Sequence, residues 1–242
     1  MNNKKNILIT GSSQGIGLAI AKHFACTHNV YITGRYPEKL EKLCNENNFT
    51  GYSAVDLTED NSADKLLNSL NANIDVLINN AGIYFYSPTD KMTDEDIFNS
   101  VKLNQIAPYM LIKKCIPYMK KQQWGRIINI GSISGVMGEA NASVYSMTKS
   151  ALIGLTKSLA LELAQDNITV NIINPGWVDT ELIDNKDLEA DFTKDEIIET
   201  IPQRRFVTPE EIANTCEFLI SDKSKTITGQ SINICAGLSL GC

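Results

Sequence analysis

The stretch N-I-L-I-T-G-S-S-Q-G-I-G, residues 6–17, decides the fold class of this chain. An apolar, strand-like run at 6–10 passes directly into a turn that carries Gly11, Gly15 and Gly17. Glycines let the backbone turn tightly and approach a pyrophosphate, and a helix beginning near Gly15 points its amino end at that anion. A structural turn explains the glycines alone about as well, so their position between a strand and a helix carries the argument. The stretch predicts a phosphate-binding βα unit.

The same alternation of short apolar runs and helical patterns continues along the chain. The β-rich runs lie at 6–10, 30–33, 51–55, 74–79, 126–130, 168–173 and 231–235. The helical patterns lie at 15–28, 37–47, 59–71, 94–121, 143–166 and 208–221. Strands that alternate with helices form a parallel sheet buried on both faces, and ligands bind beyond the carboxyl ends of its strands. The expected fold is α/β, a doubly wound parallel sheet with helices on both faces.

Length and composition limit the functional classes. The 242 residues contain no Pro/Gly/Ser-rich linker, so we expect a single domain over 1–242. A net charge of −6 argues against a nucleic-acid binder. No apolar run approaches the roughly 20 residues that span a bilayer, and the amino-terminal run is too short for a signal peptide. The six cysteines lack C-x-x-C spacing, and we expect reduced core thiols in a cytoplasmic protein.

A second stretch, S-V-Y-S-M-T-K-S-A-L at 143–152, places Tyr145 and Lys149 four residues apart in an expected helix. This spacing brings both side chains to one helix face, with Cβ atoms about 5–6 Å apart. Such pairs are common by chance, so their meaning depends on context. A phenol has an ordinary pKa of about 10, and a neighbouring ammonium favours its ionised form. In a suitable context the pair predicts a proton-transfer group.

Five motifs occur in the order and at the distances found in one enzyme family. They are T-G-S-S-Q-G-I-G (10–17), N-N-A-G (79–82), G-S-I-S-G (131–135), Y-S-M-T-K (145–149) and N-P-G-W-V-D-T (174–180). Through them the chain resembles the short-chain dehydrogenase/reductase family over essentially its whole length. G-R-I-I-N-I-G-S, I-T-V-N and I-T-G-Q-S-I-N-I are similar to its branch of 3-oxoacyl-carrier-protein reductases. The resemblance implies a Rossmann-type sheet of seven strands, a nicotinamide cofactor, ketone–alcohol interconversion by hydride transfer, and often a homotetramer.

The resemblance also implies four catalytic residues. Tyr145 is the expected general acid/base, and Lys149 is expected to lower its pKa and to hydrogen-bond the nicotinamide ribose. Ser132, after the strand at 126–130, is expected to hold the substrate oxygen and stabilise its charge. Asn104 is a poor helix former inside the pattern at 94–121. The family pattern has it interrupt that helix and hold a water that links Lys149 to solvent.

The remaining motifs are expected to bind the cofactor. Besides Tyr145 and Lys149, the resemblance implies that the cofactor-binding residues are Gly11, Ser13, Gln14, Gly15, Ile16, Gly17, Arg35, Asp56, Leu57, Asn80, Ala81, Gly82, Pro175, Gly176, Val178 and Thr180. Asp56 matches a family acid that contacts adenine, although a turn carboxylate explains it nearly as well. Thr180 is expected to meet the carboxamide or the phosphates.

The end of the second expected strand bears on the choice of cofactor. An NAD site places an acid there to hold the ribose 2′-hydroxyl, and that acid repels a 2′-phosphate. Here the strand is followed by Gly34 and Arg35, with no acid until Glu38, and Arg35 can pair with a phosphate. Gln14 stands where NADP-preferring relatives often have Lys or Arg, which counts against this. We expect NADP(H) to be favoured over NAD(H).

The substrate side of the site is less defined. Residues 177–207 are acidic and Lys-rich with weak periodicity, and we expect them to form a substrate lid. The pocket candidates, for which plain packing is an equal alternative, are Tyr84, Phe85, Tyr86, Met137, Asn141 and Trp177. His23 and His28 have no metal-binding constellation around them, so no metal site is expected.

The helices expected at 94–121 and 143–166 carry apolar residues on more than one face. These residues are Ile106, Met110, Leu111, Ile153, Leu155, Leu159 and Leu163. One face must cover the sheet, and the surplus favours helix–helix contacts across a two-fold axis over a thicker monomer core. We expect a homo-oligomer, with a tetramer first and a dimer second.

Three alternatives concern function. A catalytically silent dinucleotide-binding regulator is disfavoured by the four intact catalytic residues, and a scaffold by the glycine turn. A 3-oxoacyl-carrier-protein reductase of fatty acid synthesis is the third alternative. In that branch two arginines near the active-site mouth receive an acidic carrier domain, and here Gln123 and Asp166 hold those positions. Lys120, Lys121 and Arg126 compensate only in part. We therefore expect a small or CoA-type ketone substrate.

Overall fold

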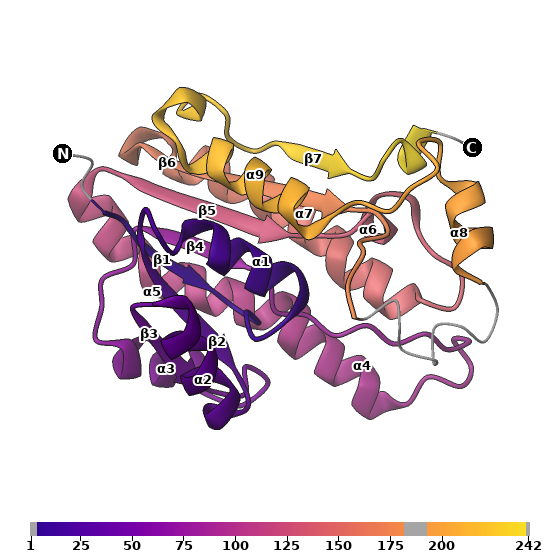
Figure 1. The fold of residues 1–242 in the computed structure, drawn as a ribbon, viewed down its shortest axis with the longest axis horizontal. Coiled ribbons are helices and arrows are strands. Elements are labelled where there is room, and N and C mark those ends of the chain that lie inside the picture. The colour runs from indigo at the N-terminus through magenta and orange to yellow at the C-terminus, as the bar shows by residue number, and fades with distance from the viewer. Residues whose placement is uncertain (1–3, 182–192, 241–242) are drawn as a thin grey trace.

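The chain folds around one parallel sheet, seen in a computed structural model that describes residues 4–181 and 193–240. The strands are β1 (Asn6–Ile9), β2 (Asn29–Gly34), β3 (Gly51–Ala54), β4 (Val76–Asn79), β5 (Gly125–Ile130), β6 (Ile168–Pro175) and β7 (Ser231–Ile234). They form a 7-stranded sheet in the order β3-β2-β1-β4-β5-β6-β7, and neighbouring strands are parallel (Figure 1). The strand order reverses between β1 and β4, which creates the switch point at which ligands bind in such sheets. The expected doubly wound α/β fold is confirmed.

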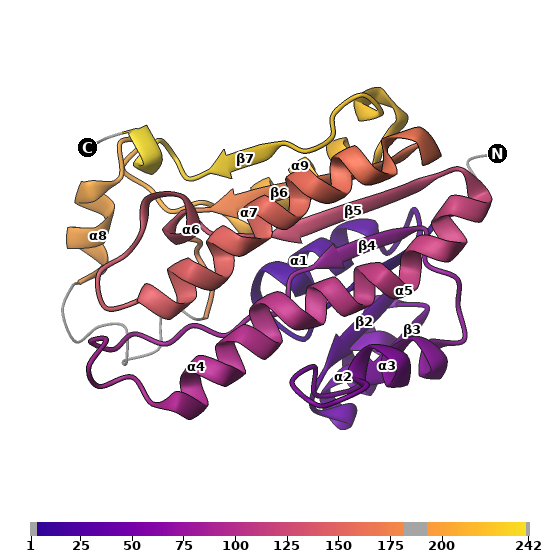
Figure 2. The same cartoon turned by 180° about the vertical axis from the view of Figure 1, so that it is seen from behind.

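Helices cover both faces of this sheet. Their bounds are α1 (Gly15–Phe24), α2 (Pro37–Asn47), α3 (Ser62–Leu70), α4 (Asp94–Val101), α5 (Ala107–Gln122), α6 (Ser134–Met137), α7 (Ser143–Leu163), α8 (Lys194–Thr200) and α9 (Pro209–Ile220). Helices α1 and α9 lie over the face seen in Figure 1, and α5 and α7 lie over the opposite face (Figure 2). In the described ranges no helix is long and apolar enough to cross a membrane.

Two hydrophobic cores, one on each face, hold the layers together. In β1, Ile7 and Ile9 pack in a cluster with residues of α1 and α9, whereas Leu8 lies in a second cluster with residues of α5 and α7. All three side chains are fully buried. Successive strand residues point to opposite faces, so a strand covered on both sides must be apolar throughout. This is why the strands appear in the sequence as continuous apolar runs.

The sequence pattern predicts one helix at 94–121, but the structure divides this stretch. It divides into α4, a π-helical segment at Lys102–Ile106 and α5. The expected interruption at Asn104 is confirmed, because this fully buried side chain lies inside the π-helical segment. Such segments occur mostly as single turns inside α-helices and are frequent at functional sites. Weak periodicity hid the two short helices α6 and α8 from the sequence analysis.

Candidate active site

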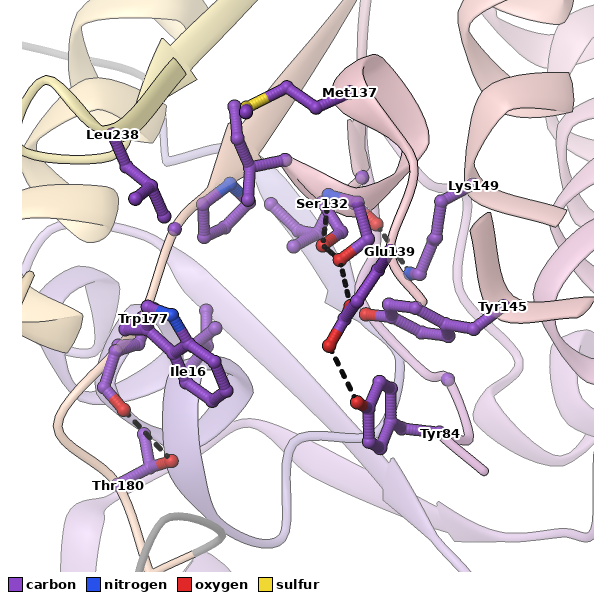
Figure 3. A pocket seen from close by; sticks show the side chains of 18 of the residues that line it. Ile16, Tyr84, Ser132, Met137, Glu139, Tyr145, Lys149, Trp177, Thr180 and Leu238 are labelled. Carbon is purple, nitrogen blue, oxygen red and sulfur yellow. Dashed lines mark hydrogen bonds between the residues drawn. The ribbon is translucent and has the colours of Figure 1, made fainter. Parts of the chain in front are cut away.

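Loops from the carboxyl ends of several strands meet around one cavity of about 370 Å³ (Figure 3). Its lining comes from the first turn of α1, from the loops that follow β4, β5 and β6, from the amino-terminal half of α7 and from Leu238 after β7. Of the expected residues, the cavity is lined by Ile16, Asn80, Gly82, Tyr84, Ser132, Met137, Tyr145, Lys149, Pro175, Gly176, Trp177, Val178 and Thr180. Residues far apart in sequence thus reach one place because the parallel sheet aligns the ends of its strands.

Tyr145 lies in the first turns of α7, beside Ser132 in the loop after β5. Burial raises the pKa of Tyr145 to about 12, the hydrogen bond with Ser132 acts in the opposite direction, and the charge of Glu139 raises the pKa further. The pKa of Tyr145 is thus raised, whereas Lys149 was expected to lower it. The reason is that desolvation destabilises the phenolate more than any neighbouring group stabilises it. At neutral pH the phenol therefore carries its proton.

Lys149 follows one helical turn later and points into the same cavity (Figure 3). Its ammonium Nζ donates a hydrogen bond to the Ile130 carbonyl at 2.8 Å and lies 5.6 Å from the centroid of the Tyr145 ring. Burial lowers the pKa of Lys149 from its ordinary value of 10.5 to about 8. The shared helix face is thus confirmed, but in this structure the ammonium donates its hydrogen bond to a backbone carbonyl rather than to the phenol.

Asn104 joins the π-helical segment to the loop after β4 and to α7. Its Oδ1 accepts a hydrogen bond from the Ile83 amide at 2.9 Å, and its Nδ2 donates to the Ile83 carbonyl and to Thr148 Oγ1, both at 3.0 Å. A Cβ on Gly82 would lie 3.3 Å from both Asn104 Oδ1 and Lys149 Nζ. Asn104 therefore lies next to the lysine, and its amide fixes the backbone that borders the cavity.

The glycine turn after β1 forms a shallow cradle at the amino end of α1. Gly11 has a φ of +61°, and a Cβ there would lie 2.8 Å from Ala81 Cα. A Cβ on Gly17 would lie 2.5 Å from Asn80 Nδ2, which itself donates to the carbonyls of Thr10 and Gly11. The N-cap residue Gln14 makes no side-chain capping bond, so the amino end of α1 remains available for an anion.

The end of β2 places two cations near this cradle. Arg35 follows Gly34 and is exposed, as expected. Lys39, in the first turn of α2, donates from Nζ to Gln14 Oε1 at 3.2 Å. The sequence analysis missed Lys39, although its place one turn after Arg35 was a signal. Gln14 stands where NADP-preferring relatives often have Lys or Arg, and Lys39 places a cation next to that position.

Asp56 and Leu57, after β3, are held by local contacts. Asp56 Oδ1 accepts hydrogen bonds from the amide and the hydroxyl of Thr58 at 2.9 and 2.7 Å. Burial by itself raises the pKa of Asp56, but the Thr58 hydrogen bonds and the charge of Arg35 outweigh it, so the pKa is lowered. Leu57 is buried in the core. The turn interpretation of Asp56 is thus present in the structure, and the carboxylate also lies within electrostatic reach of Arg35.

The segment after β6 forms the far wall of the cavity. The Pro175 carbonyl accepts a hydrogen bond from the Ile133 amide at 2.9 Å, and Val178 forms a bridge with Val207. Thr180 approaches the glycine turn, because a Cβ on Gly15 would lie 3.7 Å from Thr180 Cγ2. Of the lid expected at 177–207, residues 182–192 lie outside the described part of the chain. Its described part contains α8, which begins with a capping box of Thr193 and Glu196.

Several expectations about the pocket change with the structure. Phe85, Tyr86 and Asn141 do not line the cavity; Tyr86 Oη instead accepts a hydrogen bond from Asn141 Nδ2 at 3.1 Å. The lining residues that the sequence analysis missed are Ile83, Ile130, Gly131, Ile133, Ser134, Gly138, Glu139 and Leu238. The described residues contain no group of three His, Cys, Asp or Glu that could hold a metal ion.

Glu139 is the most consequential of the missed residues. Its Oε1 accepts a hydrogen bond from the Tyr84 hydroxyl at 2.7 Å, and its Oε2 accepts one from the Ser134 hydroxyl at 2.6 Å (Figure 3). Ser132 Oγ in turn donates to Ser134 Oγ at 3.1 Å. The rings of Tyr84 and Tyr145 meet edge to face with centroids 4.9 Å apart. A chain of hydroxyl groups thus connects this carboxylate to the expected catalytic residues.

Comparisons with known proteins agree with this geometry. A family model described as "Enoyl-(Acyl carrier protein) reductase" matches residues 11–239. The chain is 36% identical to "Uncharacterized oxidoreductase YxjF" of Bacillus subtilis (strain 168), over 97% of this chain and 98% of that protein. It is also 36% identical to the 3-oxoacyl-[acyl-carrier-protein] reductase FabG of Rickettsia felis, over 97% of this chain and 96% of that protein. The chain belongs to the short-chain dehydrogenase/reductase family.

Solved structures of short-chain dehydrogenases/reductases superpose on the whole chain. The actinorhodin polyketide ketoreductase with NADPH is 30% identical with a TM-score of 0.92, covering 98% of each chain. YwfH, titled as an NADPH-dependent reductase involved in bacilysin biosynthesis, is 29% identical with a TM-score of 0.90 and covers 98% of each chain. The chain is therefore an NAD(P)-dependent oxidoreductase of the ketoreductase type.

The residues present fit a nicotinamide dinucleotide of the kind this short-chain dehydrogenase/reductase family uses. Gly11 and Gly17 let the turn after β1 pack closely against Ala81 and Asn80, where a Cβ would overlap, and the amino end of α1 at this turn has no side-chain cap. The cavity extends from Ile16, in the first turn of α1, and Thr180 to Tyr145, so the amino end of α1 and the phenol border one connected space.

Proposed function

We propose that this enzyme reduces a ketone to a secondary alcohol with Tyr145 as the general acid. The observation that carries the proposal is a buried, protonated phenol that shares a hydrogen bond with Ser132 inside the cavity. Bound nicotinamide supplies the hydride. Tyr145 Oη donates its proton to the developing alkoxide, and Ser132 Oγ turns from Ser134 to hydrogen-bond the same oxygen. In the reverse direction the phenolate accepts that proton.

Lys149 and Asn104 support this proton transfer. We propose that the Lys149 ammonium exchanges the Ile130 carbonyl for the nicotinamide ribose when the cofactor binds, which brings positive charge closer to the phenol. That charge favours the phenolate and opposes the effect of burial on Tyr145. Asn104 holds the loop after β4 beside Lys149 and positions the water that links the lysine to solvent.

The positions of Gln123 and Asp166 correct one part of the substrate argument. Gln123 Nε2 donates to Asp166 Oδ1 at 3.2 Å, and Lys120 pairs with Asp166 at 3.2 Å. Both residues precede strands, so they lie at the amino edge of the sheet, opposite the cavity within one chain. The expected place near the active-site mouth is therefore wrong for a single protomer. Arg126 is buried and cannot compensate for them, since its side chain is 1% exposed.

We still propose a small or CoA-type ketone as substrate, with a carrier-bound 3-oxoacyl group as the alternative that the FabG relatives favour. The test is NADPH oxidation with one 3-oxoacyl chain, presented on acyl-carrier protein and on a small thioester mimic, at low and moderate salt. We expect kcat/KM values for the two forms within about threefold, because no cation from the two arginine positions meets an acidic carrier. A strong, salt-sensitive preference for the carrier-bound substrate would favour the alternative, a 3-oxoacyl-carrier-protein reductase of fatty acid synthesis. If no ketone of a broad panel causes NADPH oxidation, the proposed ketone reduction is refuted.

We propose that NADP(H) is the preferred cofactor. Gly34 removes the acid that would repel a 2′-phosphate, and Arg35 with Lys39 provides two cations at the end of β2. We expect kcat/KM to be at least about tenfold higher with NADPH than with NADH, and Arg35→Asp to reverse this order. The matched control is Lys225→Asp, because Lys225 is an exposed cation in the segment between α9 and β7. A wild-type ratio below one contradicts the proposal.

We propose a homotetramer. Apolar side chains remain exposed on the outer surface of α4, α5 and α7, where Figure 2 shows these helices side by side. The most exposed are Phe98 at 64%, Ile106 at 51% and Leu161 at 84%. Leu111, Leu159 and Leu163 of the expected surplus instead belong to the core. A second copy of the chain would cover the exposed set. Sedimentation at micromolar concentration is the measurement, and a monomer contradicts the proposal.

Residues 177–207 remain our proposed substrate lid, and we place the enzyme in the cytoplasm. The five cysteines in the described ranges are free thiols, which supports a reducing compartment.

A further inference from the structure

The part of the cavity lined by Glu139, Met137, Trp177 and Leu238, which we call the substrate half, contains a carboxylate that the reaction itself does not need. Among the described lining residues, Glu139 has the one carboxyl group and Lys149 the one amino group of a side chain. Lys149 Nζ donates to the Ile130 carbonyl and, in the proposed function, turns to the cofactor. Glu139 is therefore the charge that faces a bound substrate.

Glu139 is held in place by neutral donors. The hydroxyl groups of Tyr84 and Ser134 each donate to one of its oxygens, and the described residues give it no cationic partner. These two contacts fix the carboxylate beside Tyr145, whose ring touches Tyr84 edge to face. Its negative charge also acts on the phenol, since it raises the pKa of Tyr145. A substituent a few bonds from the reacting carbonyl must therefore lie close to this carboxylate.

A carboxylate in a partly enclosed cavity discriminates among substituents in two ways. It repels a second anion, because charges near each other in a low-dielectric site interact more strongly than in water. It also accepts hydrogen bonds through the lone pairs that Tyr84 and Ser134 leave free, so it favours N–H and O–H groups. The other side chains in this half, Met137, Trp177 and Leu238, are apolar.

We propose that Glu139 is a specificity-determining residue that selects uncharged ketones bearing a hydrogen-bond donor near the carbonyl, and that it rejects keto acids. This inference rests on the proposed function, because it concerns the substrate of the same site. The apolar side chains accommodate the remainder of such a molecule. Thioesters are not rejected, since the atoms next to their reacting carbonyl carry no charge, but they lack the donor that Glu139 favours there.

Acetoacetamide and acetoacetate are suitable probes, because they have the same shape and differ in an amide against a carboxylate. We expect wild-type kcat/KM to be at least about thirtyfold higher for acetoacetamide. Glu139→Gln keeps groups that can bond Tyr84 and Ser134 but removes the charge. It should reduce this preference by at least about tenfold, chiefly through a lower KM for acetoacetate. Glu162→Gln removes the same charge from an exposed site on α7 and should change nothing. A preference in Glu139→Gln within twofold of wild type overturns the proposal.

A binding measurement separates this inference from the proposed function. In a Tyr145→Phe background, which is expected to bind NADPH without turnover, the fluorescence of enzyme-bound NADPH can be titrated with both compounds for the wild-type Glu139, Glu139→Gln and Glu139→Asp forms. We expect acetoacetamide to bind more tightly to wild type and to Glu139→Asp, which keeps the charge, and the difference to fall at least about tenfold in Glu139→Gln. Absence of ketone reduction refutes the proposed function, whereas the affinity ratio still decides on Glu139. Equal affinity in wild type, or binding of neither compound, overturns the specificity role.

Discussion

Replacing Tyr145 with phenylalanine will lower kcat for ketone reduction by roughly 10³–10⁴-fold while leaving NADPH affinity within about threefold of wild type. The substitution removes the hydroxyl that donates the proton and changes the volume of the side chain very little. The ring remains packed edge to face against Tyr84 at 4.9 Å between centroids, so the cavity keeps its shape. Stopped-flow or steady-state NADPH oxidation gives kcat, and fluorescence titration gives the affinity.

The exposed Tyr109 on α5 provides the control for this substitution, because Tyr109→Phe removes the same hydroxyl far from the cavity. That variant should keep wild-type kcat. The assignment of the acid is wrong if Tyr145→Phe retains most of its activity, or if its loss of activity is matched by a loss of NADPH binding.

Replacing Lys149 with methionine will reduce kcat/KM by at least about a hundredfold and will raise the free energy of unfolding at pH 7 by about 1–2 kcal/mol. The activity falls because the charge near the phenol and the proposed ribose contact are lost. The stability rises because Lys149 is 4% exposed and pays for its charge by desolvation, which lowers its pKa to about 8. The lost hydrogen bond to the Ile130 carbonyl offsets part of this gain. Urea unfolding provides the free energies.

The pH dependence of this stability difference has a definite sign. In the unfolded chain Lys149 has its ordinary pKa of 10.5, and in the folded chain about 8. Between these values the unfolded state binds more protons, so the free energy of unfolding of wild type rises with pH. The advantage of Lys149→Met is therefore largest below pH 8 and shrinks as the pH approaches 10.5. Lys157→Met, on an exposed position of α7, should show neither effect. The explanation is contradicted if the stability advantage of Lys149→Met over wild type is no larger at pH 7 than at pH 10.

The two halves of the site differ in how much of them could be predicted from the sequence. The glycine turn and the Tyr145–Lys149 spacing depend on neighbours within a few residues, so local patterns were enough. Asn104 could be placed only through the family resemblance, because a polar residue inside a helical pattern is more often solvent-facing than an interruption. By contrast, Tyr84 and Glu139 are 55 residues apart and meet only through the loops after β4 and β5. No periodicity records such a contact.

Two errors have separate physical causes. The pKa of Tyr145 was expected to fall because Lys149 lies on the same helix face, but the sequence does not show how deeply the phenol is buried, and desolvation is the larger effect. The placement of Gln123 and Asp166 near the cavity of the same protomer could have been avoided. Residues that precede parallel strands lie at the amino edge of the sheet, and both residues precede strands.

The sequence by itself determined the doubly wound sheet, the glycine turn after the first strand and the shared helix face of Tyr145 and Lys149. These features follow from the alternation of strands and helices, glycine geometry and helical spacing, which are local properties, whereas the catalytic roles of Asn104, Ser132, Tyr145 and Lys149 are what the family resemblance implies. Only the tertiary structure decided the rise in the pKa of Tyr145, the pairing of Lys149 with the Ile130 carbonyl and the contacts of Glu139 with Tyr84 and Ser134. Burial and long-range contacts set these three, because the free energy of a charge depends on every group around it and on how much water the fold excludes.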